Sequence, residues 1–482
     1  MCGEPCEKQV CHTCADPDVQ DSVVDQILFR TLADVDPDME TIDDMTITIP
    51  NCGHVFTVET LDGICDMAEF YERSDDDTRW VGLKAPPSGF VKPPTCPTCR
   101  AAITCPRYGR IFKRADLDIL ERNVTSAMSQ SLAGVSHQLQ QKSPEQCSVH
   151  VKEAAIVHKP QLEVTITTGD KFKQRAAEQK KLLKETRQTP LPPNCINAAA
   201  EKLHGVTKAE VAAWRQGPIR SLFTAYQEAF RLADTRSAHT HAWEASFAYL
   251  YNCEMESAAQ DPARAPRNPQ EHAMRMARMK VGQPQPRADM RFRVEAFWHT
   301  INIRLVLVDL VQAWTDKLFE DSVTMQKNRR LWDAYASFLL KTCAQDAQIA
   351  LHMTVESGSH RQTVRTQLII LRIALEQFRF NVAVMRHNSR MSVEQRSELA
   401  NRAHDKWEDT KTRIRATCQE YLVSRSDTTT EGTWLAENFV SPAQTLLDEW
   451  RKLETSLRRD TFYQQLSLQE MTDVVKALNF CK

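Results

Sequence analysis

The sequence predicts a small, zinc-stabilised α+β domain at the N-terminus followed by a mainly α-helical bundle. Cysteines crowd the start of the chain, where nine of the 15 fall within the first 105 of 482 residues. Two short β-like runs lie in the same region. Beyond residue 197, apolar residues recur every three to four positions, as on one face of a helix. Only 13 residues are glycine, which argues against a turn-rich β architecture.

The composition argues against several functional classes. The sequence contains neither a G-x-x-x-x-G-K-[ST] phosphate loop nor a G-x-G-x-x-G dinucleotide motif. It has no apolar run near the roughly 18 residues that span a bilayer, and it does not begin with a secretory signal. We therefore expect an intracellular protein, in the nucleus, the cytoplasm or both, with no membrane partner. The sequence offers no catalytic residues, and whether the chain is an enzyme stays open at this point.

The net charge of −2 hides a strong asymmetry. Residues 1–80 contain 20 Asp and Glu against four Lys and Arg, so they carry −16, and the remaining residues carry +14. Such segregation indicates parts with different partners, or an acidic part that docks on a basic one. A solvated acidic loop beside an ordinary basic domain explains it equally well.

The first elements are those of the N-terminal domain. Runs 46–49 and 54–58 alternate apolar and polar residues, and turn residues at 50–53 separate them. A short helix is expected at 61–73. Zinc would stabilise this region, because an intracellular chain keeps its thiols reduced and a dense Cys/His cluster then indicates a metal site.

Two zinc ions are the expected cofactors. Zinc takes four thiolate or imidazole ligands in a tetrahedron, and two ligands on one tight turn supply half of it. The simplest partition of the ligands places Cys2, Cys6, Cys11 and Cys14 on one ion and Cys52, His54, Cys96 and Cys99 on the other. Each ion would contribute about 10–16 kcal/mol of apparent binding free energy to folding. His12 is an alternative ligand for the first ion, and Cys65 and Cys105 are either buried thiols or further ligands.

A basic stretch follows the last of these ligands. Its cations are interleaved with aromatic residues, which suits phosphate contacts combined with stacking on unpaired bases. The candidate nucleic-acid-binding residues are Arg107, Tyr108, Arg110, Phe112, Lys113 and Arg114. The alternative interpretation is that these residues form a solvated surface or a binding surface for the acidic segment of the chain.

The rest of the chain divides into three parts. Residues 123–196 are polar and weakly periodic, so we expect a linker there with some helix at 172–187. The helical bundle is expected over 197–466, with a mobile, proline-rich connector at 261–288. Its clearest helix is 363–387, whose apolar stripe is core packing: Leu368, Leu371, Leu375, Phe378, Val382 and Met385. A last helix is expected at 467–482.

These motifs resemble one known family. The residues that carry the resemblance are Cys2-Gly-Glu-Pro-Cys6, Cys11-x2-Cys14, the run 51–59 around Cys52 and His54, Cys96-Pro-Thr-Cys99 and the run 107–114. Over about 120 residues, their order and spacing resemble the region after the last finger in the NFX-type zinc-finger-containing helicase family. These superfamily-one RNA-helicase-like proteins are linked to RNA silencing, heterochromatin and antiviral defence.

The resemblance has several implications. Residues 1–15 would be the end of an array of zinc fingers. Residues 16–122 would form a RING-like or treble-clef-like zinc domain with an acidic insert. Residues 467–482 would form a helix that leads into an RZ-type finger, which this sequence lacks. The helicase core is missing too, so the chain would be a fragment without ATPase activity. RNA, silencing-complex proteins and the missing helicase core are the implied partners. A RING-like ubiquitin ligase scaffold and a purely structural platform are the alternative functions.

Overall fold

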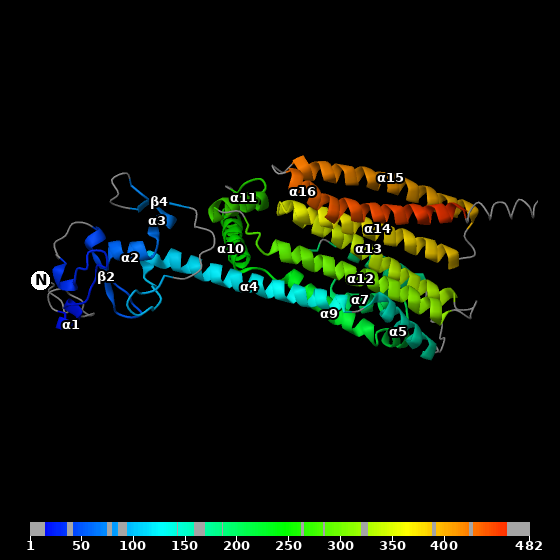
Figure 1. The fold of residues 1–482 in the computed structure, drawn as a ribbon, viewed down its shortest axis with the longest axis horizontal. Helices are drawn as coiled ribbons and strands as arrows, with labels where there is room; N and C mark the ends of the chain where they lie inside the picture. Colours follow the sequence, from blue (N-terminus) through cyan, green and yellow to red (C-terminus); the bar gives the residue numbers. More distant parts are fainter. Residues whose placement is uncertain are drawn as a thin grey trace, which may run out of the picture. The chain divides into compact units, whose positions relative to one another are not determined.

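The computed structural model describes residues 15–35, 42–74, 80–84, 94–141, 143–158, 169–185, 187–261, 265–282, 285–319, 326–387, 392–423 and 428–459 (Figure 1). This part of the chain is mainly helical, and its strands form two small two-stranded sheets. The chain divides into two compact units. The N-terminal unit comprises Met1–Ser126 and Arg236–Pro286, and the bundle unit comprises Ala127–Thr235 and Arg287–Lys482. The predicted combination of a small α+β region with a helical bundle is confirmed at this level.

The N-terminal unit contains both sheets. Its elements are α1 (Pro17–Gln20), η1 (Leu32–Asp34), η2 (Ile42–Asp44), β1 (Thr46–Thr48), β2 (Val55–Thr57), α2 (Val58–Ile64), α3 (Met67–Phe70), β3 (Tyr71–Arg73), β4 (Trp80–Leu83), η3 (Pro106–Tyr108), the first part of α4 (Gly109–Gln140), α10 (Ala238–Gln260) and α11 (Pro269–Val281). Strands β1 and β2 are the two predicted β-like runs. They pair antiparallel with Ile47 opposite Phe56, and β3 pairs antiparallel with β4.

The helix expected at 61–73 is broken into shorter elements. Asp66 adopts a left-handed backbone conformation (φ +51°) between α2 and α3, and the chain then continues as strand β3. A residue in that conformation cannot continue a right-handed helix. Phe70, which ends α3 after this break, is buried in a small hydrophobic core together with Ile49, Phe56 and Leu61.

The bundle unit is all-helical in its described residues. Its elements are the rest of α4, α5 (Pro144–Val157), α6 (Gly169–Lys184), α7 (Pro193–Ala198), the π-helical turn η4 (Ala199–Leu203), α8 (Lys208–Trp214), α9 (Pro218–Asp234), α12 (Met290–Leu318), α13 (Gln326–Glu356), α14 (His360–His387), α15 (Val393–Val423), α16 (Thr428–Leu435), the π-helical turn η6 (Ala436–Val440) and a helix over 441–459. Helices α12, α13 and α14 lie side by side, α5 and α9 pack on α12, and α15 packs on α14 (Figure 1). No helix in the described ranges is both long and apolar enough to cross a membrane.

Helix α14 shows how the apolar period builds the bundle. Of the predicted stripe, Leu371, Leu375, Phe378, Val382 and Met385 are buried and Leu368 is partly buried. Phe378 stacks on Trp450 of the helix over 441–459, with ring centroids 5.4 Å apart. The stripe therefore packs α14 against the C-terminal helices, and its prediction is confirmed.

The expected linker at 123–196 is instead largely helical and partly packed. Helices α4, α5 and α6 occupy most of its described residues. Val135, Cys147, Val151 and Ala155 belong to the main core of the bundle unit. The apolar period is weak here because only one side chain per turn is buried, while its polar neighbours face solvent.

The proline-rich connector at 261–288 contains helix α11. The Asn268 side chain accepts a hydrogen bond from the Glu271 N–H, Pro269 occupies the first turn, and Gly282 ends the helix with a left-handed φ of +69°. Proline is compatible with a first helical turn, because no intrahelical acceptor exists there for its missing N–H. Pro269 therefore starts this helix instead of breaking it. Residues 262–264 and 283–284, and with them part of the expected mobile connector, lie outside the described residues.

A buried ionic network ties the segment before α7 to the bundle. The Arg304 Nη2 of α12 donates to the Asp346 Oδ2 of α13 at 2.5 Å, and both side chains are fully buried. Asp346 also accepts a hydrogen bond from Arg187 at 3.0 Å and one from the backbone N–H of Leu191 at 3.1 Å. One carboxylate thus accepts hydrogen bonds from two cations and one backbone group.

The buried His204 predicts a pH dependence of stability. Its ring packs on Tyr335 and Phe338, and burial, with minor contributions from Lys341 and Arg175, lowers its pKa to about 4. Below about pH 6.5 the imidazole of the unfolded chain binds a proton that the buried imidazole of the folded chain does not bind until about pH 4. The free energy of unfolding is therefore highest above pH 6.5 and decreases as the pH falls towards 4. We expect the free energy of unfolding to drop by about 2 kcal/mol between pH 7 and pH 5 through this group.

The measurement is urea unfolding at both pH values for the native chain and for His204→Gln, which has no titratable ring. The pH-dependent loss should shrink by that amount in the variant. An equal loss in both proteins would assign the titration to another group.

Candidate metal centre

The first half of the site is the turn between β1 and β2. The N–H groups of Cys52 and Gly53 both donate to the Ile49 carbonyl, at 3.2 and 2.8 Å, and the Ile49 N–H donates to the His54 carbonyl at 2.8 Å. Gly53 has a left-handed φ of +73°, which glycine adopts without steric cost. The turn places the side chains of Cys52 and His54 at the end of the small sheet.

The second half is a turn around the Cys-Pro-Thr-Cys motif. The Cys96 N–H donates to the Ala101 carbonyl at 2.7 Å, and the Arg100 N–H donates back to the Cys96 carbonyl at 2.8 Å. Arg100 closes the turn with a left-handed φ of +61°. The Asn51 side chain donates to the Ala102 carbonyl at 3.2 Å, so a hydrogen bond joins the two halves.

The two turns bring all four predicted ligands together. One ligand atom from each of Cys52, His54, Cys96 and Cys99 lies within 4.8 Å of the other three. In a tetrahedral zinc site with Zn–S distances near 2.3 Å, the sulfur atoms are about 3.8 Å apart, so this spacing fits a single ion. In the described part of the chain, no other group of three or more Cys, His, Asp or Glu side chains has this arrangement.

The donor atoms have the chemistry that a metal ion requires. His54 Nδ1 is buried and has no hydrogen-bond partner, although a buried polar atom normally finds one. Burial raises the pKa of the Cys52 thiol to about 11, whereas a backbone N–H at Ala101 lowers the pKa of the Cys99 thiol. Coordination would satisfy the orphaned nitrogen and hold the thiolates deprotonated. Four protein ligands leave no open position, which is typical of structural sites.

The remaining cysteines of this region are separate from the cluster. Cys65 and Cys105 are buried in the core of the N-terminal unit, and burial raises the pKa of both thiols. The structure places them as core thiols. The other predicted site, formed by Cys2, Cys6, Cys11 and Cys14, lies outside the described residues, so the second ion stays a prediction.

Asp62, which the sequence reasoning did not single out, engages two of the candidate nucleic-acid-binding residues. The Arg107 guanidinium donates twice to its carboxylate, at 2.8 and 2.6 Å, and the Tyr108 hydroxyl donates to it at 2.9 Å. The Trp80 indole N–H is a fourth donor, at 2.9 Å. Tyr108 is fully buried, so its ring presents no face to solvent.

The other four basic and aromatic candidates lie at the start of α4. Arg110 donates to the carbonyls of Phe70 and Lys84, both at 3.2 Å, and its guanidinium lies over the Tyr71 ring. Arg114 pairs with Asp118 at 3.2 Å. Phe112 is half-buried and Lys113 is exposed. Three of the four candidate cations are thus engaged within the N-terminal unit.

Comparison of this chain with protein-family models, with curated proteins and with solved structures found no match.

Proposed function

We propose that the chain is a zinc-binding, non-catalytic interaction module. The observation that carries this proposal is the convergence of Cys52, His54, Cys96 and Cys99 within 4.8 Å of one another. Three thiolates and one imidazole favour zinc over calcium or magnesium, which prefer oxygen ligands. A closed set of four ligands suits an ion that stabilises the fold and leaves recognition to the surface around it.

Metal analysis of the purified chain tests this proposal. Native mass spectrometry should find about one zinc per chain from this cluster, and about two if the four cysteines at 2–14 hold a second ion. A Cys96→Ser variant should lose one equivalent. A chain that is folded and metal-free after purification with zinc present would contradict the proposal.

We further propose that the module binds RNA or a protein of an RNA-silencing assembly, as part of an NFX-type helicase-like protein. The family resemblance supports this assignment, together with the net charge of +14 beyond residue 80. Lys113 is the candidate cation best placed for a phosphate, because Arg107, Arg110 and Arg114 are engaged internally.

RNA binding is expected to depend on salt and on Lys113. Fluorescence anisotropy with a single-stranded RNA should give a dissociation constant that rises with salt. Lys113→Glu should weaken binding and flatten the log–log salt dependence by about 0.7 for each phosphate that the variant no longer neutralises. The matched control is Lys152→Glu, which reverses an exposed charge on α5. If the chain does not bind RNA at low salt, or if the dissociation constant does not change with salt, the RNA proposal is contradicted. A protein would then be the proposed partner.

The alternative is a RING-like ubiquitin ligase scaffold, since Cys-Pro-x-Cys and Cys-x-His also occur in RING domains. A RING cross-brace holds two ions with eight ligands, whereas the described residues bring together one set of four. An autoubiquitination assay distinguishes the two functions, because a scaffold for a conjugating enzyme should label itself and an RNA-binding module should not.

A further inference from the structure

We propose that copies of this chain associate head to tail, with an apolar loop of one copy seated in a groove on the bundle unit of the next. The loop is Gln26–Phe29 in the N-terminal unit. The groove lies between α13, α14 and α15. This inference is independent of the metal site and of RNA binding.

The loop exposes three large apolar side chains in a row. Ile27 and Leu28 are each 62% exposed, and Phe29 is 78% exposed. A single exposed apolar residue is ordinary, but a contiguous apolar patch on a protein surface is typical of an interaction site. These residues are close to the sheet, because the Thr57 N–H of β2 donates to the Val24 carbonyl at 2.8 Å.

The loop is held in place by charged groups at its base. The buried Asp25 carboxylate accepts hydrogen bonds from the N–H groups of Ile27 and Leu28, at 2.9 and 3.0 Å. Arg30 bridges Asp25 and Asp44, at 2.8 Å to each. Phe29 adopts a left-handed φ of +53°, which is uncommon for a bulky residue and turns the chain sharply. The apolar side chains are therefore presented by an ordered backbone, which lowers the entropic cost of binding.

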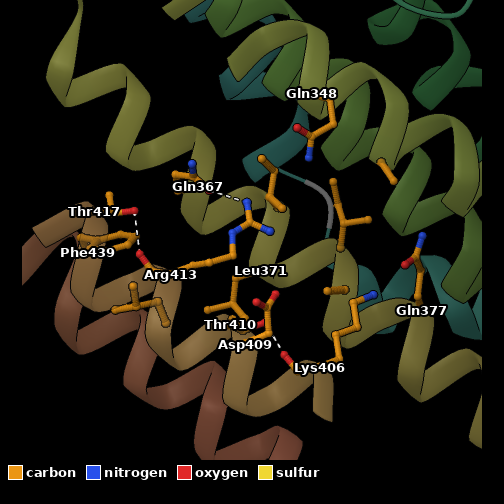
Figure 2. A pocket seen from close by; sticks show the side chains of 15 residues that line it. Gln348, Gln367, Leu371, Gln377, Lys406, Asp409, Thr410, Arg413, Thr417 and Phe439 are labelled. Carbon is orange, nitrogen blue, oxygen red and sulfur yellow. Dashed lines mark hydrogen bonds between the residues drawn. The ribbon is translucent and has the colours of Figure 1, made fainter. Parts of the chain in front are cut away.

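The groove has an apolar floor and a polar rim (Figure 2). Ile370, Leu371 and Ala374 of α14 form much of the floor, together with Ile414 of α15 and Phe439 of the turn η6. On the rim, α15 contributes the exposed Lys406, Asp409 and Arg413, and the Arg413 guanidinium donates to Gln367 at 3.4 Å. All of these residues belong to the bundle unit.

Loop and groove match in size and in charge. The groove encloses about 200 Å³, and an apolar cavity of about 150 Å³ already accommodates benzene. One phenyl ring therefore fits, with room for part of a neighbouring side chain. The segment that carries the loop, 15–35, also carries exposed carboxylates at Asp16, Asp18, Asp21 and Asp34, whereas two of the three charges on the rim are cationic. Complementary charge of this kind steers association and sets its orientation.

The two surfaces lie on different units, so the contact is heterologous. After a single contact, each copy retains either a free loop or a free groove, so association continues as an open chain or closes into a ring, of which a reciprocal dimer is the smallest. The proposal thus predicts association that grows with concentration, to a reciprocal dimer or beyond it.

Sedimentation velocity over a range of concentrations tests the proposal with the full chain. The native chain should show a weight-average sedimentation coefficient that rises with concentration and falls when salt increases from about 0.1 to about 0.5 M. The loop variant Leu28→Ser/Phe29→Asn retains the backbone, because asparagine tolerates a positive φ. The rim variant Lys406→Glu/Arg413→Glu changes only exposed side chains. Each should weaken association at least about tenfold.

The decisive experiment mixes the two variants. A loop variant still has an intact groove, and a rim variant still has an intact loop, so an equimolar mixture should form a heterodimer that stops at one junction. The controls are Val81→Ser, which removes an exposed apolar side chain elsewhere, and Lys152→Glu/Lys208→Glu, which matches the change in charge. Both should associate like the native chain.

Two results would overturn the proposal. One is a native chain that sediments as a monomer at every concentration, which would leave the loop free, docked within its own chain or bound to another protein. The other is an association that both variants retain, or a mixture that stays monomeric. Circular dichroism of each variant establishes that it is folded.

Discussion

Replacing Cys96 by serine is expected to unfold the region around β1, β2 and the Cys96–Cys99 turn. Cys96 is fully buried and belongs both to the ligand cluster and to the core of the N-terminal unit. If the cluster holds zinc as proposed, the loss of Cys96 removes one of the four ligands of an ion whose apparent binding free energy supports folding. We expect the free energy of unfolding of this unit to fall by about 5 kcal/mol or more, because structural zinc contributes about 10–16 kcal/mol.

Hydrogen exchange separates this effect from a general loss of stability. Amides in 46–57 and 95–105 should lose protection, while those in α12, α13 and α14 keep it. The matched control is Cys105→Ser, which changes a thiol buried in the same core but outside the cluster. That variant should retain its metal and lose only about 1–2 kcal/mol. Equal protection in Cys96→Ser and Cys105→Ser would show that no ion supports this fold.

Removing the Asp346 carboxylate should strongly destabilise the bundle unit. Asp346→Ala leaves the fully buried Arg304 without its partner, and it also takes an acceptor from Arg187 and from the Leu191 N–H. Breaking a buried ion pair on one side typically costs about 3–5 kcal/mol, because an uncompensated charge stays in the interior. Urea unfolding followed by tryptophan fluorescence measures the loss.

Two further variants identify its cause. Glu449→Ala removes the carboxylate of an exposed pair with Arg379 and should cost at most about 1 kcal/mol. The double replacement Arg304→Met/Asp346→Leu removes the fully buried pair and leaves Arg187 its hydrogen bond to Gln345, so we expect it to recover part of the stability lost in Asp346→Ala. A double variant as unstable as Asp346→Ala would mean that packing, and not the unpaired charge, dominates the loss.

The sequence predicts the metal cluster and the bundle helices well because both depend on short-range spacing. Ligands separated by one or two residues must share a turn, which is why Cys52 and His54, and Cys96 and Cys99, could be paired in advance. That the two pairs meet also followed from zinc's need for four ligands. Helix α14 was predictable for a similar reason, since its apolar residues repeat with the period of the helix itself.

Other features depend on long-range contacts that spacing does not encode. The sequence of 123–196 is typical of a linker because only about one side chain per turn is buried, as at Val151 and Ala155, and the apolar period is therefore weak. The sequence around Arg107 and Tyr108 predicts a nucleic-acid contact. It carries no sign that Asp62, more than 40 residues earlier, accepts hydrogen bonds from both side chains. The composition of a segment gives its charge, but tertiary contacts decide which of its charges remain accessible.

The uneven burial of the four ligands determines how an ion held there would leave. Cys96 is fully buried, Cys52 and His54 are half-buried, and Cys99 is exposed. A chelator or an oxidant arriving from solvent therefore meets the sulfur of Cys99 before any other ligand. Release would begin with that one thiolate while three ligands still hold the ion. A short exposure to a chelator or an oxidant would therefore be reversible. Only prolonged exposure would remove the ion and unfold the sheet of β1 and β2 beside the site.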